Sequence, residues 1–320
     1  MRGKIVLADT IGYCWGVRRT LEIIQRAGHP ANQIATIGDV IHNPQVVERL
    51  RRSGVQTALS VDDASRRGFS QIAITAHGAS PERNRRAGEL GLTTVDTTCP
   101  LVTKVQRLAQ KLVKQGYFVV VYGDECHPEV RGILGWAGTS RTVAAKHVED
   151  LPWNAPRGRG QDQELQSPPR KVAVISQTTK IVEEFLKFTR DLTDLVARDG
   201  GEIRICNTIC APTTERQNAL ERLASEVDVI LVVGGRKSSN TARLAEVGRS
   251  YGVESHHIES ELDIDLAWLT SAHNVGVTAG ASTPDYVIER VIDQLAILGY
   301  DRPTMNTWQE QFDLEHEPSY

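Results

Sequence analysis

The sequence lacks the features that mark several classes of protein. Its longest apolar runs, such as 229–233, are far shorter than the ~20 residues that cross a bilayer. The 37 basic and 40 acidic residues give a formal net charge of −3, so no nucleic-acid or membrane partner is expected. Met1 is not followed by a long apolar core with a small-residue cleavage site, so we predict a cytoplasmic protein without a secretory leader.

Cysteine is scarce, and its number is odd. Five cysteines in 320 residues disfavour a disulfide framework and favour metal binding or redox use in a reducing compartment. The paired C-x-x-C spacing that is usual for zinc sites is also absent.

Short β-rich runs alternate with helical patterns along the chain, which predicts an α/β protein with largely parallel sheets. The plan repeats about every hundred residues. We therefore predict three similar α/β units at 1–98, 99–209 and 210–300, followed by a tail at 301–320. The segment 153–170 is rich in Pro, Gly, Gln and Arg and is expected to be an exposed loop without chemistry.

Three of the cysteines occupy matching places, each where a strand gives way to a helix. They are Cys14, Cys99 and Cys210, one in each predicted unit. Pro100 suits the first position of a helix, so Cys99 would meet the free N–H groups and the dipole that stabilise a thiolate. Because ligands in α/β proteins gather beyond the carboxyl ends of strands, three facing units would bring the three thiols to one centre.

Three converging thiolates without a fourth favour an iron–sulfur cluster in which one iron has no protein ligand. A zinc site is the competing metal interpretation and ranks lower because of the missing C-x-x-C pairs. Three unrelated buried cysteines are a further alternative, which the matching contexts disfavour. Cys126 and Cys206 have no counterpart in the repeat, and we predict that they are ordinary thiols.

Polar residues at other strand ends form a second group. Hydroxyls and bare N–H groups at helix N-termini bind anions, so several of them at corresponding strand ends predict a phosphate or diphosphate site. Any one of these serines could equally be a helix N-cap, and any one histidine a turn or core residue. The group consists of His42, His77, His127, Ser238, Ser239, Asn240 and Ser282.

A carboxylate beside this group could move protons. Glu129 is the candidate, and the hydroxyl of Thr178 could relay the proton. If the segment around Pro128 is extended, His127 and Glu129 point to the same side. The alternative is an ordinary surface glutamate.

Together these motifs resemble the 4-hydroxy-3-methylbut-2-enyl diphosphate reductase family, which carries out the last step of the methylerythritol phosphate route to isoprenoids. The resemblance covers nearly the whole chain, in order. It rests on GYCWGV at 12–17, VIHN at 40–43, TAHG at 75–78, DTTCPLV at 96–102, HPEV at 127–130, QTT at 177–179, NTIC at 207–210, SSN at 238–240 and TAGAS at 278–282.

The resemblance implies three α/β domains in a pseudo-threefold arrangement around one [4Fe–4S] cluster. Three irons would be held by Cys14, Cys99 and Cys210, and the fourth would take the substrate hydroxyl. Glu129, with Thr178 and His127, would supply the proton that lets water leave. The diphosphate would be held by His42, His77, His127, Thr178, Ser238, Ser239, Asn240 and Ser282.

The family's reaction would pass two electrons from ferredoxin or flavodoxin to an allylic diphosphate. Protonation of the resulting allylic anion would then yield isopentenyl or dimethylallyl diphosphate. Two other classes stay open: a cluster-bearing hydro-lyase and a non-catalytic redox sensor. Turnover that depends on a reductant would exclude the first, and tight diphosphate binding would argue against the second.

Overall fold

The structure is a computed structural model that describes residues 3–28, 34–153 and 167–303. Its strands are β1 (Ile5–Leu7), β2 (Ile34–Ile37), β3 (Val55–Ala58), β4 (Gln71–Ile74), β5 (Thr93–Asp96), β6 (Phe118–Tyr122), β7 (Thr142–Ala145), β8 (Lys171–Ser176), β9 (Glu202–Ile205), β10 (Val229–Val233), β11 (Glu254–Ile258) and β12 (Val275–Ala279). Its α-helices are α1 (Trp15–Ala27), α2 (Pro44–Arg52), α3 (Val61–Arg66), α4 (Pro81–Glu89), α5 (Pro100–Lys114), α6 (Pro128–Ala137), α7 (Val182–Arg198), α8 (Ala211–Ala224), α9 (Ser239–Ser250) and α10 (Asp285–Ile297). Among these helices, none is both long and apolar enough to cross a membrane.

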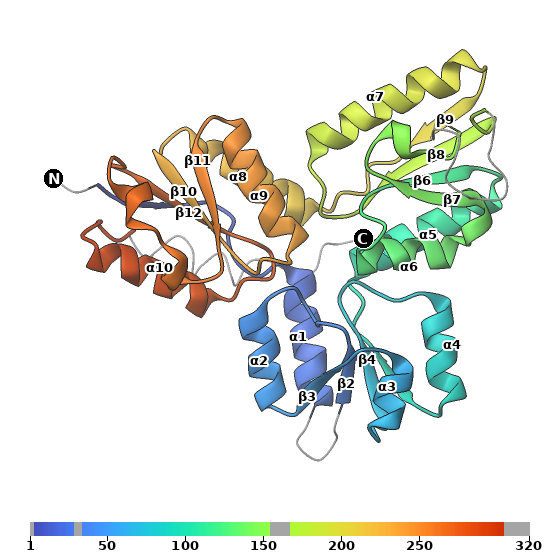
Figure 1. Cartoon of the computed structure of the whole chain (residues 1–320), viewed down its shortest axis with the longest axis horizontal. Coiled ribbons are helices and arrows are strands. Elements are labelled where there is room, and N and C mark those ends of the chain that lie inside the picture. The colour runs from blue at the N-terminus through green and yellow to red at the C-terminus, as the bar shows by residue number, and fades with distance from the viewer. Residues whose placement is uncertain (1–2, 29–33, 154–166, 304–320) are drawn as a thin grey trace. The chain divides into compact units, whose positions relative to one another are not determined.

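The strands form three four-stranded sheets, with the orders β1-β12-β10-β11, β3-β2-β4-β5 and β7-β6-β8-β9 (Figure 1). Every strand pair whose register is described is parallel. The predicted α/β class with parallel sheets is therefore confirmed.

The chain divides into two compact units, one joining Met1–Thr57 to Ala211–Tyr320 and the other comprising Ala58–Cys210. β1 pairs with β12, with Ile5 opposite Val275 in the register. The N-terminal strand therefore belongs to the sheet of the last third of the chain, although it precedes the other strands of the predicted first third. The predicted boundaries of three α/β units stay a prediction.

The sheet of β6 and β8 has helices on both faces, as Figure 1 shows. Phe118, Val120 and Tyr122 of β6 share a core with α7, whereas Val119 and Val121 share one with α5 and α6. Because β6 is buried on both faces, its sequence is apolar at every position. This explains why a short, uninterrupted apolar run predicted this strand correctly.

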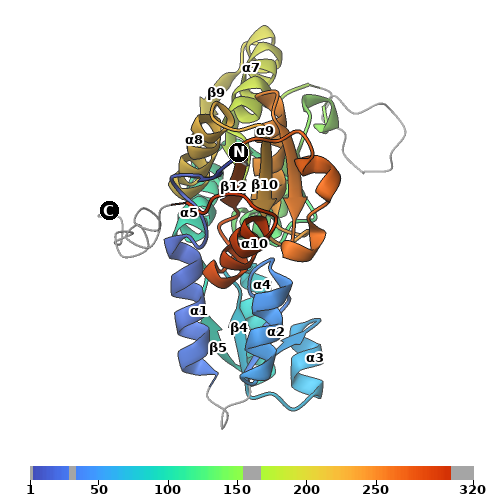
Figure 2. The same cartoon turned by 90° about the vertical axis from the view of Figure 1, so that its left-hand side faces the viewer.

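The sheet of β10 and β12 is covered in the same way. Val229, Leu231 and Val233 pack in one core with α10. Ile230 points to the opposite face, where its side chain lies next to Gly248 of α9. Figure 2 shows the ribbons of α9 and α10 beside this sheet. Strand alternation thus gives each central strand two apolar faces, and polar chemistry is left to the loops at the strand ends.

Local sequence signals mark the starts of several helices. Asn43 caps α2, with its Oδ1 accepting from the N–H of Val46 at 3.1 Å, and Pro44 takes the first helical position. Cys99 is the N-cap of α5, as predicted from Pro100. α8 begins at Ala211, directly after Cys210.

Two predictions about local structure were wrong. The segment after His127 is not extended, because Pro128 begins α6 and His127 is its N-cap. Pro at the first position and Glu129 in the first turn are both helix-start signals, so the sequence did contain the information. Trp153 is buried against Phe118, with ring centroids 5.4 Å apart, so the predicted exposed loop does not begin there. Most of that loop, 154–166, lies outside the described residues.

Candidate functional site

The same arrangement of strand ends occurs in all three sheets. One edge strand of each sheet leads to a predicted cysteine: β1 to Cys14, β5 to Cys99 and β9 to Cys210. The next strands inward are β12, β4 and β8, and the strands after those are β10, β2 and β6. Each cysteine therefore occupies an equivalent topological position, which supports the repeat inferred from the sequence.

Each cysteine is also tied by its backbone to the loop after the neighbouring strand. Its N–H donates to a carbonyl there: Cys14 to Ala281 at 3.1 Å, Cys99 to Ala76 at 3.0 Å and Cys210 to Thr178 at 3.1 Å. Ala281 and Ala76 directly precede the predicted site residues Ser282 and His77, and the third acceptor, Thr178, is itself a predicted site residue. The remaining predicted residues follow the third strands, with His42 after β2, His127 and Glu129 after β6, and the 238–240 run after β10.

The three cysteines have the setting of metal-binding thiolates. Cys14 and Cys99 are the N-caps of α1 and α5, and Cys210 directly precedes α8. All three are half-buried, and none of the five cysteines is in a disulfide. Helix N-termini favour the thiolate, which is the form that binds iron, so these residues fit an iron–sulfur group. Cys126 is exposed, and Cys206 packs in part against the core beneath α5.

Arg216 of α8 supports the Cys14 loop and was not predicted from the sequence. Its side chain is fully buried, and its guanidinium donates to the carbonyls of Gly12 at 2.8 Å and Pro212 at 2.9 Å. It lies on the buried face of α8, four residues before Leu220. A charged residue at an apolar position of a helical pattern was the signal that could have found it.

The unit of Met1–Thr57 and Ala211–Tyr320 brings His42 close to the start of α9. A Cβ atom on Gly235 would collide with the carbonyl of His42, so the two loops touch through their backbones. A Cβ atom on Gly280 would likewise collide with the side chain of Thr241, whose hydroxyl donates to Ser238 Oγ at 2.9 Å. The loops of β2, β10 and β12 that carry the predicted anion ligands therefore lie side by side within this unit.

Two of these predicted ligands carry buried polar atoms that lack a protein partner. Asn240 Nδ2 and Ser282 Oγ are both buried, and neither has a hydrogen-bond partner among the described residues. Such atoms are costly unless something else binds them, so they support an anion site here. Ser238 is the N-cap of α9 and accepts from the N–H of Thr241 at 3.3 Å, so the cap interpretation also holds for it. Ser239 is the first residue of α9 and is half-buried.

Burial lowers the pKa of His42, an effect that Asp39 opposes and Lys237 reinforces. The imidazole is therefore held in its neutral form before any anion binds. A bound anion would oppose this shift, because a nearby negative charge favours imidazolium.

The unit Ala58–Cys210 places His77 and His127 together. Their ring centroids are 5.4 Å apart and the rings are perpendicular. His127 Nδ1 accepts from the N–H of Glu129 at 3.2 Å, so in the neutral ring the proton is on Nε2. His127 therefore presents an N–H donor at the tip of its ring, as an anion ligand requires.

Glu129 and Thr178 form a buried pair in the same unit. Glu129 is 2% exposed, and its two carboxylate oxygens accept from the Thr178 N–H at 2.7 Å and the Thr178 Oγ1–H at 2.8 Å. Burial raises the pKa of Glu129 to about 7, although the two bonds from Thr178 oppose the shift. A carboxyl group that is half-protonated near neutral pH is suited to general acid catalysis. The alternative of a surface glutamate is excluded.

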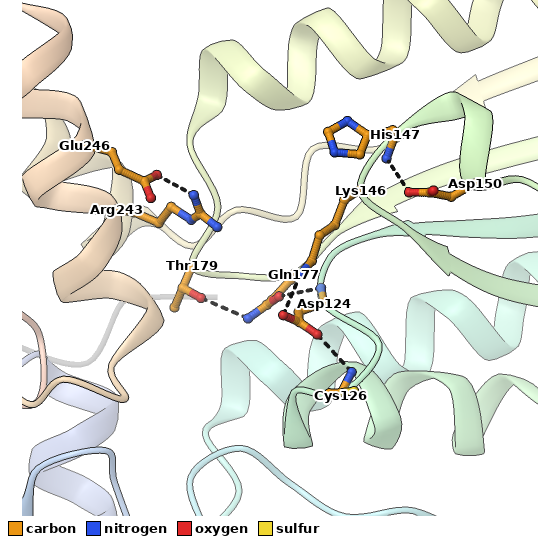
Figure 3. Close-up of polar contacts among 9 residues, drawn as sticks. All are labelled: Asp124, Cys126, Lys146, His147, Asp150, Gln177, Thr179, Arg243 and Glu246. Carbon is orange, nitrogen blue, oxygen red and sulfur yellow. Dashed lines mark hydrogen bonds and ion pairs between the residues drawn. The ribbon is translucent and has the colours of Figure 1, made fainter.

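A polar network fixes the loops that carry this pair (Figure 3). Gln177 accepts from the N–H of Asp124 at 3.2 Å and donates to Thr179 Oγ1 at 3.2 Å. Asp124 in turn accepts from Lys146 Nζ at 2.7 Å and from the N–H of Cys126 at 3.0 Å. The loop before His127 and the loop around Thr178 are thereby joined.

Trp136 is a further supporting residue that the sequence did not reveal. Its indole N–H donates to the carbonyl of Ala79 at 2.9 Å, two residues after His77. Trp136 and His127 both belong to α6 or its cap, so this helix holds both histidine loops of the unit.

Comparison with known proteins gives consistent matches. Residues 5–296 match the family model described as LytB protein. A protein from Anaeromyxobacter sp. (strain Fw109-5) named 4-hydroxy-3-methylbut-2-enyl diphosphate reductase is 38% identical over 301 residues, covering 94% of this chain and 99% of the relative. One of the same name from Dehalococcoides mccartyi (strain CBDB1) is 36% identical over 294 residues, covering 91% and 97%.

Solved structures agree. The E-1-hydroxy-2-methyl-but-2-enyl-4-diphosphate reductase from Plasmodium falciparum superposes with a TM-score of 0.83 at 24% identity, covering 95% of this chain and 92% of that one. This similarity shows the fold. A structure titled as (E)-4-hydroxy-3-methyl-but-2-enyl diphosphate reductase, the terminal enzyme of the non-mevalonate pathway, has a TM-score of 0.63 at 32% identity, covering 92% and 99%.

Proposed function

This chain belongs to the LytB family of 4-hydroxy-3-methylbut-2-enyl diphosphate reductases, and on that basis we propose that it catalyses the terminal step of the non-mevalonate pathway. The substrate is (E)-4-hydroxy-3-methylbut-2-enyl diphosphate, and the products are isopentenyl diphosphate and dimethylallyl diphosphate. The overall change consumes two electrons and two protons and releases the substrate hydroxyl as water. The reaction needs an electron donor, for which ferredoxin and flavodoxin are the candidates.

The cofactor in this proposal is one [4Fe–4S] cluster held by Cys14, Cys99 and Cys210, at the centre of three α/β units. When bound, the cluster supplies the electrons for the reduction and a Lewis acid for the substrate oxygen. The observation that supports this most is the equivalent placement of the three cysteines on the edge strands of three sheets.

The diphosphate is bound by neutral donors in this proposal. Asn240 Nδ2 and Ser282 Oγ supply buried groups that otherwise lack a partner, and His127 supplies its Nε2–H. His42, His77, Thr178, Ser238 and Ser239 complete the set. Binding then satisfies polar atoms whose desolvation is already part of the folded state, so the site is preorganised for the anion.

Glu129 is the proton source for the leaving water. Its protonated carboxyl can donate to Thr178 Oγ1, and the Thr178 O–H can turn toward the substrate hydroxyl, because a hydroxyl both donates and accepts. The short distance between Glu129 and Thr178 makes this relay possible without movement of either backbone. His127 orients Glu129 by accepting its N–H.

Anaerobic purification followed by three measurements tests the proposal: an ultraviolet–visible spectrum, an iron count and turnover with dithionite-reduced methyl viologen. We expect about four irons per chain and substrate consumption that depends on the reductant. Turnover without a reductant would indicate a hydro-lyase. Binding of iron without any turnover of the diphosphate would indicate a redox sensor.

A further inference from the structure

The exposed face of α5 carries a stripe of positive charge. It consists of Lys104, Arg107, Lys111 and Lys114, all exposed, which we call the α5 basic stripe. Their spacing of three, four and three residues places them within about 80° around the helix, at 100° per residue. The buried residues Val105, Ala109 and Leu112 lie on the other side.

The stripe has no internal charge compensation. α5 contains no acidic residue, and none of the four cations forms an ion pair within the described ranges. Some cations on other helices are paired: Arg51 bonds Glu48 at 2.7 Å in α2, and Lys187 bonds Asp191 at 2.7 Å in α7. α5 differs from α2 and α7 because it has four exposed cations and no acidic residue of its own to pair with them.

Helix stability does not explain the stripe. Cations in the last turn, such as Lys114, are favoured by the helix dipole, but a cation near the first turns is not. Lys104 and Arg107 lie beyond the first turn and outside the last one, so the dipole does not favour them. Like charges three or four residues apart also repel each other. The fold therefore carries a small cost here, which a negatively charged partner would offset.

The position of the stripe indicates which partner this is. α5 begins directly after Cys99, and five residues at about 1.5 Å each place Lys104 about 8 Å further along the helix axis. Resting on the proposed function, in which Cys99 is a cluster ligand, we propose that the α5 basic stripe is the docking surface for an acidic electron-transfer protein. Each turnover needs two electrons, which two donor molecules supply by losing one electron each.

Charge of this kind acts mainly on the rate of encounter. Complementary surface charges steer a partner and raise its association rate, and salt weakens the effect because the Debye length is about 8 Å at physiological ionic strength. The donor is therefore expected to bind more weakly as salt rises, whereas a small reductant without protein contacts is not affected in this way.

The test is the double variant Lys104→Glu/Arg107→Glu of the holoenzyme, assayed with reduced ferredoxin and separately with dithionite-reduced methyl viologen. Both residues are exposed and lie away from the packed face of α5, so the variant should fold. We expect the KM for ferredoxin to rise about tenfold, the order expected when several exposed charge contacts are lost, and its salt dependence to flatten. The kcat with methyl viologen should stay at the wild-type value.

The matched control is Arg190→Glu/Arg198→Glu on α7, which reverses two exposed cations of the same unit. A ferredoxin KM that is unchanged in the α5 variant, or raised equally in the α7 control, overturns the docking proposal. So does binding of the wild-type chain to anionic phospholipid vesicles that the α5 variant loses, because the stripe would then face a membrane. Failure of the wild-type enzyme to turn over with methyl viologen would refute the proposed function instead.

Discussion

Glu129→Gln is expected to remove the proposed acid of the site without changing the structure around it. Glutamine has nearly the same size as glutamate and can still accept from the Thr178 N–H, which lies 2.7 Å from the carboxylate. It cannot ionise and cannot act as an acid. The variant should therefore keep its cluster and its affinity for the diphosphate, while losing both the proton source and the cost of a buried charge.

The stability effect can be worked out from the pKa of Glu129, which burial raises from 4.5 to about 7. Below pH 4.5 the group is protonated in both folded and unfolded chains and adds no cost. Between pH 4.5 and 7 the folded state keeps a proton that the unfolded state has lost, so stability falls as pH rises. Above pH 7 the cost is complete, at about 3 kcal/mol.

Urea unfolding at pH 5 and pH 8 measures this directly. The free energy of unfolding of Glu129→Gln should differ little from wild type at pH 5 and exceed it by up to about 3 kcal/mol at pH 8. The exposed Glu149→Gln is the control and should show no such pH-dependent gain. An equal gain at both pH values would mean that Glu129 is not held protonated by burial.

Catalysis gives the second half of the prediction. Turnover of the wild-type enzyme should fall as pH rises through about 7, because only protonated Glu129 can donate. Turnover of Glu129→Gln should be slower by about 10²–10⁴-fold and should not show this decrease as pH rises through about 7. Single-turnover kinetics on the anaerobically reduced enzyme is the decisive assay. Cleavage at the wild-type rate would remove Glu129 from the mechanism and leave the diphosphate of the substrate as the proton carrier.

Three other substitutions test the remaining parts of the site. Cys99→Ser should lose both iron and activity, whereas the control Cys126→Ser should keep both, as measured by an iron count and a turnover assay. Normal iron content with full activity in Cys99→Ser would contradict the proposed ligand set. Ser282→Ala should weaken diphosphate binding about tenfold without loss of iron, and unchanged affinity by calorimetry would place the anion elsewhere. Arg216→Met should lower the free energy of unfolding by about 2–4 kcal/mol, because the carbonyls of Gly12 and Pro212 lose charge-assisted hydrogen bonds. An unchanged midpoint of urea unfolding would show that these two bonds do not stabilise the fold.

The central strands could be predicted from the sequence because their signal is local. β6 and β10 are buried on both faces, and this burial requires apolar residues at all five consecutive positions of each strand. Helix starts marked by Asn43 and by Pro100 are local in the same sense, since a cap and a proline act within one turn.

The pairing of β1 with β12 could not be predicted in this way. Ile5 and Val275 are opposite each other although 270 residues separate them, and no short pattern encodes such a partner. α6 was missed for a different reason. Pro128 and Glu129 are helix-start signals, but an extended segment would also be compatible with a proline and would place His127 and Glu129 on one side.

The candidate site shows the same division between local and non-local information. Residue types at strand ends sufficed to select Glu129 and Thr178, but their bonds depend on strands that are neighbours in the sheet and far apart in the sequence. The raised pKa of Glu129 follows from burial, which a proline-flanked glutamate in the sequence does not reveal. The buried position of Arg216 could have been predicted from the sequence, because this charged residue interrupts the apolar face of a helical pattern.

The repeated hydrogen bond from each cysteine explains how one backbone plan can serve two kinds of chemistry. In every sheet the cysteine N–H is bound by the loop after the neighbouring strand, so the backbone of the cysteine is held to that loop by main-chain atoms alone. The side chain in the loop is then unconstrained by this bond. In two sheets the acceptors are Ala281 and Ala76, which directly precede the proposed anion ligands Ser282 and His77. In the third sheet the acceptor is Thr178 itself, whose hydroxyl donates to the buried acid Glu129 at 2.8 Å. The proposed proton relay therefore differs from the other two sheets at the acceptor position, where a threonine stands in place of an alanine.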